Sequence, residues 1–200
     1  MKVRFSILIF VMVLSGCATT SLKPSDAHKI SKSEGILVAS VTRGIMQRGM
    51  MTNNGVTAYI TINPKGQSVN GKVLGSNAKG SFGIGSGIAV KDGKLNVENM
   101  KPGEYQISTW ELYVPGGGGA YISLSPKQFD PIDFVIEQGK VNYIGNIHLE
   151  SVYGENFVGV LVEQGAEMRC DNKSQTDISL FQKEFPGFGS WEIRNAPIKC

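Results

Sequence analysis

Apolar and polar residues alternate along much of the chain with the period of two that is typical of half-buried β-strands. The clearest case is residues 56–63, where Val56, Ala58, Ile60 and Ile62 alternate with more polar side chains. Similar alternation or short apolar runs, separated by glycine-rich turns, occur at residues 36–42, 69–74, 88–97, 105–114, 132–136, 141–149, 157–171 and 191–194. This spacing predicts a mainly β fold.

The pattern also predicts where strands turn or bend. Asp92 and Gly93 predict a tight hairpin, because a type I′ turn needs positive φ at both central residues. That register pairs apolar residues on one face, Val90 with Leu95 and Ile88 with Val97. In residues 105–114 the apolar positions change parity, which predicts a β-bulge or burial on both faces.

A second hairpin is predicted within residues 157–171, with its turn near Gln164 and Gly165. Its returning strand carries Ala166, Met168 and Cys170 at alternate positions. These three side chains share one face, so we expect Cys170 to point inward.

One segment has the period of a helix. Ser174 and Asp177 fit a capping box, and Pro186 with Gly187 ends the run. Its apolar residues recur at helical spacing, as Ile178, Phe181 and Phe185. We therefore predict one short C-terminal α-helix that packs on the edge or end of a sheet.

The N-terminus has the pattern of a secretory signal peptide. Lys2 and Arg4 precede the largely apolar run 5–14, and small residues follow it. Ten helical residues reach only about 15 Å, half of a hydrocarbon core of roughly 30 Å. Residues 1–16 are therefore predicted to be a cleaved signal and not a membrane span.

The residues Leu14, Ser15, Gly16 and Cys17 resemble the lipobox of bacterial lipoproteins. The resemblance implies cleavage before Cys17, a diacylglycerol thioether on its sulfur, and further acylation of the new amine. Ala18 follows where inner-membrane lipoproteins often carry Asp, which favours the outer membrane and a periplasm-facing protein. The alternative is an ordinary secretory signal with a chance cysteine.

Cleavage would leave 184 of the 200 residues and lower the formal charge from +3 to +1. A near-neutral chain without Lys or Arg blocks has no nucleic-acid footprint. Residues 17–33 are polar and aperiodic, so we predict an acylated flexible linker there and one folded domain over 34–200.

Two cysteines remain beyond the predicted anchor, Cys170 and Cys200. An export route permits oxidation, and a bond between them would close a loop of about 30 residues. A disulfide that holds the chain end is our preferred prediction. Two unpaired thiols, or a disulfide to a partner, are the alternatives.

The stretch from Asp92 to Tyr105 resembles the carboxypeptidase regulatory-like, or prealbumin-like, family. It has a glycine turn, an alternating strand with Leu95 and Val97, and a corner formed by Pro102, Gly103 and Tyr105. The resemblance covers roughly residues 56–114 and implies an antiparallel β-sandwich, prealbumin-like or Ig-like. We expect the later strands and the helix to complete the same domain.

Candidate chemistry is sparse. His148 is the sole histidine of the predicted folded part, so one chain cannot build a multi-histidine zinc site. By parity it should lie opposite Tyr143, Ile147 and Leu149, on a wetter face with Asn142, Asn146 and Glu150. A hydrolase would have to use His148 as its base.

The carboxylates of the folded part are predicted to be solvated rather than paired for acid–base catalysis, namely Asp130, Asp133, Glu137, Glu150 and Glu155. Asp130 and Asp133 flank Pro131, but their spacing lacks the calcium-loop pattern of an EF-hand. We therefore predict no metal, no cofactor and no catalytic residue.

Two glycine-rich segments could be taken for binding loops. Gly83, Gly85 and Gly87 lead into a hairpin rather than a helix, so they predict a β-loop and not a phosphate site. The segment 116–119, between Tyr113 and Tyr121, could touch a ligand or partner.

Together these patterns predict a membrane-anchored envelope protein that acts as a non-catalytic binding or scaffold module. Its partner would be membrane lipid through the anchor, and another envelope protein or a glycan through strand edges and glycine loops. The alternative is an envelope hydrolase with an unusual site that uses His148.

Overall fold

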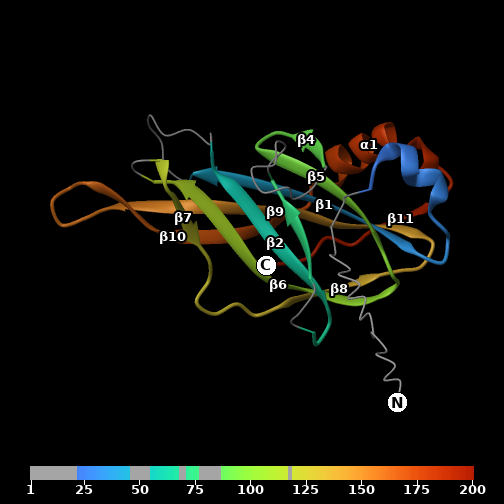
Figure 1. Ribbon diagram of the computed structural model, residues 1–200, viewed down its shortest axis with the longest axis horizontal. Coiled ribbons are helices and arrows are strands. Elements are labelled where there is room, and N and C mark those ends of the chain that lie inside the picture. Colours follow the sequence, from blue (N-terminus) through green and yellow to red (C-terminus); the bar gives the residue numbers. More distant parts are fainter. Residues whose placement is uncertain (1–21, 46–54, 68–70, 77–86, 117–118) are drawn as a thin grey trace, which may run out of the picture.

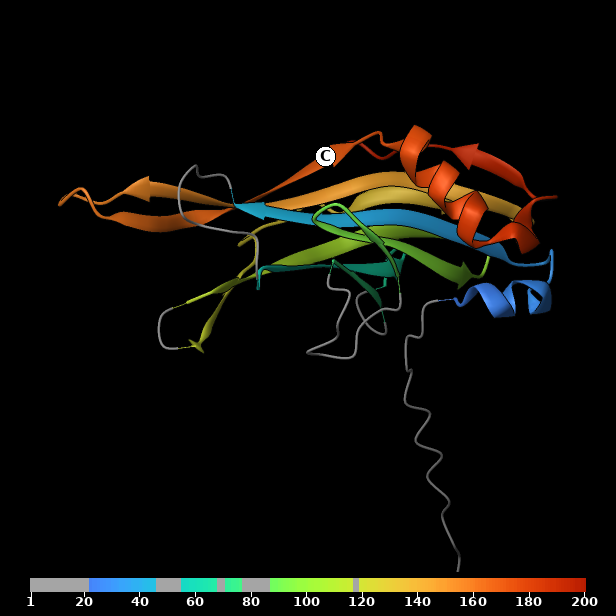
Figure 2. The same ribbon diagram turned by 90° about the horizontal axis from the view of Figure 1, so that it is seen from above.

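A computed structural model describes residues 22–45, 55–67, 71–76, 87–116 and 119–200. Two β-sheets lie one above the other, and the helical segments lie beside them (Figures 1 and 2). The fold is mainly β with one short C-terminal α-helix, which confirms the predicted class at that level. No helix among these residues is both long and apolar enough to cross a membrane.

The first sheet, sheet A, has six strands. Its order is β10 (Leu161–Asp171), β9 (Lys140–Glu155), β1 (Gly35–Ile45), β5 (Gly93–Met100) and β4 (Ile88–Val90), and β11 (Glu192–Asn195) also pairs with β9. The pairs β1–β9 and β9–β11 are parallel, and the other pairs are antiparallel. Sheet A is therefore mixed and not purely antiparallel.

The second sheet, sheet B, has five strands, all paired antiparallel. Its order is β3 (Lys72–Gly75), β2 (Thr57–Pro64), β6 (Gly103–Pro115) and β7 (Tyr121–Leu124), and β8 (Ile132–Ile136) pairs with the other end of β6. Strand β10 is thus an edge strand of sheet A, and β7 and β8 are edge strands of sheet B on the same side of the two stacked sheets.

Three helical segments accompany the sheets: η1 (Pro24–Lys29), α1 (Ser174–Glu184) and η3 (Pro186–Phe188). The helix α1 contacts β1 and β9, and its Phe181 packs with Ile36 and Val38 of β1. It therefore covers a face of sheet A and does not sit on an edge or end as predicted.

The sequence of β1 is almost continuously apolar because both faces of this strand are buried. Leu37, Ala39 and Val41 belong to the core between the sheets, whereas Ile36 and Val38 belong to the second core under the helices. A strand covered on both faces loses the polar alternation of an exposed sheet.

The bulge predicted in residues 105–114 is confirmed. Thr61 pairs with Thr109, and the next residue, Ile62, pairs with Ile107, so Ser108 is the extra residue of β6. The bulge turns Ile107 and Trp110 toward the same core between the sheets.

The predicted register of the first hairpin is wrong by two positions. Ile88 pairs with Leu95, and Val90 pairs with Gly93, so Lys91 and Asp92 form the turn. Asp92 takes the positive φ of 60°. Gly93 serves packing instead, because a Cβ there would lie 2.2 Å from the carbonyl oxygen of Val41 on β1.

The second hairpin also turns at a different place. Its turn follows Asn156, whose side-chain oxygen accepts the N–H groups of Val158 at 3.0 Å and Val160 at 2.9 Å. Gln164 and Gly165 lie instead at a shift in the β9–β10 register. The asparagine sets the turn because its side chain mimics a backbone acceptor.

The described part of the expected linker packs on the domain. The Leu22 N–H donates to the Val97 carbonyl oxygen at 2.9 Å, and Ala27 of η1 is 5% exposed. A Cβ at Gly187 would lie 2.9 Å from the Ala27 Cβ, so η1 and η3 approach closely. Residues 22–33 are thus part of the folded body, which differs from the prediction.

Candidate functional site

Six polar side chains line the face of sheet A beneath and beside α1, and we call them the polar row. They come from β1, β9 and α1 and are Ser40, Thr42, Tyr143, Asn146, His148 and Asp177. All except His148 are buried. Such a cluster is where catalysis would be sought first, since buried polar groups are costly unless bonded.

A bulge in β9 brings these residues to one face. Val38 pairs with Tyr143, but the next residue, Ala39, pairs with Gly145, which leaves Ile144 as the extra residue. Gly145 has φ +110°, a conformation that favours glycine. Tyr143 and His148 consequently share a face, so the prediction that they lie on opposite faces is wrong. The prediction that His148 lies opposite Ile147 and Leu149 is confirmed.

Sequence reasoning singled out neither Ser40 nor Thr42, and it assigned Asp177 only to a helix cap. Its Oδ2 accepts the Ser40 hydroxyl at 2.6 Å and the Tyr143 hydroxyl at 2.8 Å. Asp177 is 4% exposed. The predicted capping box is wrong, because α1 starts at Ser174 with Lys173 as its N-cap, and no side-chain cap hydrogen bond forms there. A signal was present, because Asp177 precedes Phe181 by four residues and so shares the buried face of the helix.

Tyr143 reinforces this junction between sheet and helix. Its hydroxyl also accepts the N–H of Lys173, just before α1, at 3.2 Å. Burial, and then the charge of Asp177, raise the pKa of Tyr143 far above its ordinary value. The phenol is therefore a fixed donor that holds the start of α1 on β9.

Hydrogen counting assigns the orientation of the Asn146 side chain. The Ser40 and Thr42 hydroxyls each lie 3.0 Å from one of its amide atoms, and the other amide atom has no partner in the described part of the chain. Each hydroxyl has one proton, and Ser40 gives its proton to the Asp177 carboxylate at 2.6 Å. The Ser40 hydroxyl therefore has none left for Asn146 and needs a donor from it, so we place the amide nitrogen on that side.

His148 ends the row at the surface. Its Nδ1 lies 2.8 Å from the Thr42 hydroxyl, and its Nε2 lies 3.9 Å from Glu150 Oε2. The Arg169 guanidinium pairs with the same Glu150 carboxylate. Burial, followed by the nearby cations Arg169 and Lys173, lowers the pKa of His148, which keeps its imidazole neutral.

The row is well bonded but closed to substrates. The hydroxyl-bearing residues Ser40 and Thr42 are 1% and 2% exposed. A nucleophile must reach a reacting atom at about 3 Å, and neither hydroxyl has an open approach. The arrangement links α1 to sheet A, which is a structural role.

The neutral state of His148 predicts an acid-sensitive contribution to stability. As pH falls below about 6.5, the unfolded chain takes up a proton before the folded chain does, so the free energy of unfolding falls. We expect His148→Gln to remove this part of the decline. Urea unfolding at about pH 7.5 and about pH 5.5 measures it, with Gln182→Ala on the exposed face of α1 as control. Equal declines in wild type and His148→Gln would contradict the assignment.

An open groove lies along the side where β10 faces β8 and the β7–β8 connection, and we call it the seam groove. Its volume is about 620 Å³. The lining is largely apolar and comprises Trp110, Pro126, Gln128, Phe129, Asp130, Pro131, Ile132, Met168, Lys199 and Cys200. A groove of this size with few polar groups is typical of a binding site.

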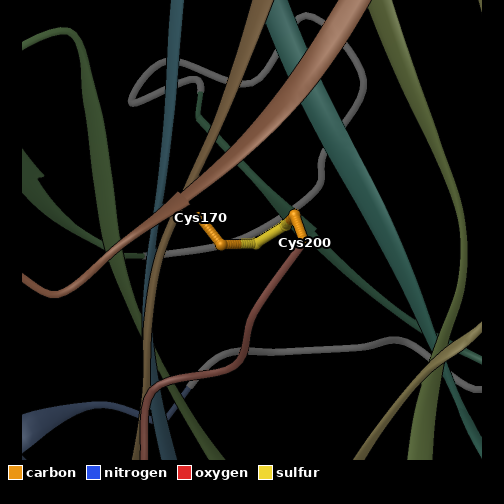
Figure 3. Close-up of a disulfide and its surroundings, with 2 residues drawn as sticks. All are labelled: Cys170 and Cys200. Atoms are coloured by element: carbon orange, nitrogen blue, oxygen red, sulfur yellow. A yellow bond between two sulfur atoms is a disulfide. The ribbon is translucent and has the colours of Figure 1, made fainter.

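Figure 3 shows the Cys170–Cys200 disulfide. Cys200 is also one of the residues that line the seam groove. The Cα atoms of the two cysteines are 5.4 Å apart, and Cys170 packs against the core between the sheets, as predicted. The tail before Cys200 is held by β9, because Ala196 and Ile198 donate their N–H groups to the carbonyl oxygens of Tyr143 and Ile144. The disulfide thus fixes one wall of the groove.

The structure does not gather the predicted carboxylates into one site. Asp130 lines the seam groove, Asp133 pairs with Lys65 at 2.8 Å, and Glu137 pairs with Arg194 at 2.7 Å. Glu150 lies beside His148, and Glu155 is exposed at the end of β9. Among the described residues no three acidic, histidine or cysteine side chains form a potential metal cluster.

The remaining predicted residues fall into two groups. Leu14, Ser15, Gly16, Cys17, Gly83 and Gly85 lie outside the described residues, as do residues 117–118. Gly87 is described and leads into β4, as expected for a β-loop, and Tyr121 is 57% exposed.

Comparisons with known proteins name no family for this chain. No protein-family model matches it, and no curated protein matches it. A leucine-rich repeat protein of Bacteroides thetaiotaomicron aligns with 57% of the chain, at 16% sequence identity and a TM-score of 0.31. The aligned part is 13% of that protein's length, so the likeness is confined to a small share of it.

Proposed function

We propose that this chain is a lipoprotein of the bacterial envelope, anchored at Cys17, whose folded part is a non-catalytic binding module. Support for the anchor comes from the signal-like run and the Leu14–Cys17 motif. Ala18 after the cysteine supports the outer membrane, with the module facing the periplasm. Two or three acyl chains hold a protein stably, whereas one chain does so only marginally.

The observation that supports the binding role is a difference in solvent access between two parts of the molecule. The side chains most suited to chemistry, Ser40 and Thr42, are buried, and Asp177 is buried with them. The seam groove, in contrast, is open and mostly apolar. A surface of that kind favours recognition of a partner over a reaction.

The finer fold assignment is part of the same proposal. We place the domain with the prealbumin-like sandwiches, on the evidence of the corner between β5 and β6. There Gly103 has φ +154°, and the Tyr105 ring stacks on Phe134 with centroids 6.0 Å apart.

The groove favours a protein partner over a glycan. Sugar rings are usually bound against open aromatic faces, but Trp110 is only 5% exposed. Phe129, the other aromatic residue of the lining, is only partly exposed. The remaining apolar lining includes Pro126, Pro131, Ile132 and Met168, beside the polar residues Gln128, Asp130 and Lys199. Apolar side chains of another envelope protein fit this lining better.

Photo-crosslinking in intact cells tests the proposed function. A photoreactive residue replaces Gln128, which is exposed and lines the groove, or Gln182, which is exposed on α1. We expect the probe at 128 to capture a defined envelope protein that the probe at 182 does not capture. Identical products from both positions, or products with lipid alone, would count against a binding module.

A further inference from the structure

Strand β10 presents an unpaired edge beside the seam groove. It ends sheet A on that side, and its pairing within the described residues is with β9. An edge strand leaves a row of N–H and C=O groups without strand partners. Past the shift at Gln164 and Gly165, Ala166–Asp171 keep a regular register with β9. These six residues therefore form a regular template for another strand.

The inner side chains of β10 connect this edge to the groove. Ala166, Met168 and Cys170 pack against the core between the sheets, and Met168 also lines the groove. Neighbouring strands lie about 4.8 Å apart, with alternate side chains on opposite faces. A strand added beside Ala166–Asp171 would run along the groove and point every second side chain into it.

The opposite wall supplies apolar side chains, and its β7–β8 connection offers few main-chain donors. It includes Trp110 and Ile132 from sheet B, with Phe129 from the β7–β8 connection. Pro126 and Pro131 of the same connection have no N–H to donate. Main-chain pairing is thus available on the β10 side and apolar contact on the other.

The outer face of β10 is acidic. Glu167 and Arg169 are roughly half exposed, and Arg169 is shared between the carboxylates of Glu167 and Glu150. Asp171, also exposed, continues the same face. Near this face the three carboxylates outnumber the two cations, Arg169 and Lys173. A basic side chain opposite Glu167 on a neighbouring strand would therefore be stabilised, since opposite charges across a strand pair attract.

We propose that the β10 edge and the seam groove together bind an extended polypeptide segment of another protein as an added β-strand. This inference rests on the binding role proposed above and specifies its ligand. The segment carries apolar residues at alternate positions, which enter the groove, and a basic residue beside Glu167. An acyl chain lacks main-chain groups for the β10 edge, so an extended polypeptide fits this edge better than a lipid does.

Synthetic peptides of about nine residues, alternating valine with lysine or threonine, serve as the probe. Three versions are compared: unmodified, N-methylated at the lysine and threonine positions, and N-methylated at the valine positions. N-methyl groups block hydrogen bonding along one edge of the peptide in a strand. Titration calorimetry measures binding to the Cys17→Ser chain, which keeps the whole folded body.

Strand addition predicts that one N-methylated isomer binds at least about ten-fold more weakly than the other, because each lost hydrogen bond contributes about 1 kcal/mol. We also expect Glu167→Lys to weaken binding of the unmodified peptide about three-fold, and Glu184→Lys on α1 to leave it unchanged. Glu167 is partly exposed, so its exchange leaves the core intact.

Two results would overturn the inference. The first is the absence of saturable binding at peptide concentrations up to about 1 mM. The second is equal binding of the two N-methylated isomers. Equal binding would identify a simple apolar site. Neither result affects the outcome expected for crosslinking from residue 128. Strand addition can therefore be wrong while the proposed binding function remains supported. The absence of a specific crosslinked protein from residue 128 would instead contradict the proposed binding function itself.

Discussion

Replacing Cys17 with serine is expected to move the protein from the membrane fraction of producing cells to the soluble fraction. Serine has no thiol to form the thioether, so the lipid anchor cannot be attached. Each buried CH₂ contributes about 0.8 kcal/mol, so the loss of two or three acyl chains removes far more binding energy than any surface contact supplies. Fractionation of cells after a high-salt wash, followed by detergent phase partitioning, measures the change.

The matched control for this variant is Ser21→Ala, which lies near the cysteine but outside the lipobox. It should stay with the membranes as the wild type does. Retention of Cys17→Ser in the membrane fraction would show that something other than an acylated cysteine holds the protein there.

Removing the disulfide should cause the second large effect. The bond closes a loop with a sequence separation of 30 residues. In the chain-entropy model such a loop stabilises the folded state by about 3 to 4 kcal/mol. We therefore expect the double variant Cys170→Ala with Cys200→Ala to lose about that amount of unfolding free energy, measured by urea unfolding. The slope of the free energy against urea should rise slightly, because the unfolded chain is more expanded without the cross-link.

Reduction of the wild-type protein provides the matched comparison, because it opens the same loop without changing a side chain volume. Both treatments should destabilise the protein by similar amounts. A loss below about 1 kcal/mol in both would contradict a stabilising role of the bond. In that case the hydrogen bonds from Ala196 and Ile198 to β9 would hold the tail by themselves.

The sequence pattern predicted the β class well, because alternation records which face of each strand is covered. It offered a bulge within residues 105–114, as one of two alternatives, and the inward position of Cys170. It failed where a backbone irregularity changes parity without an obvious polar signal. Ile144 and Gly145 shift the register of β9, and this single extra residue moved His148 to the face of Tyr143.

Other errors arose because the pattern cannot tell which of several contacts a residue will make. Asp177 fits a local cap, yet the buried hydroxyls of Ser40 and Tyr143 provide stronger partners. Gly93 fits a turn, yet close approach to Val41 requires the glycine. The seam groove was beyond prediction, since it joins Trp110, Met168 and Cys200, residues far apart in the sequence.

The anchor at Cys17 is the central claim, and mass spectrometry of the mature N-terminal peptide tests it most directly. We expect a peptide that begins at Cys17 and carries a diacylglycerol group with further acylation of its amine. A mature N-terminus at any other residue, or an unmodified Cys17 on protein recovered from membranes, would contradict it.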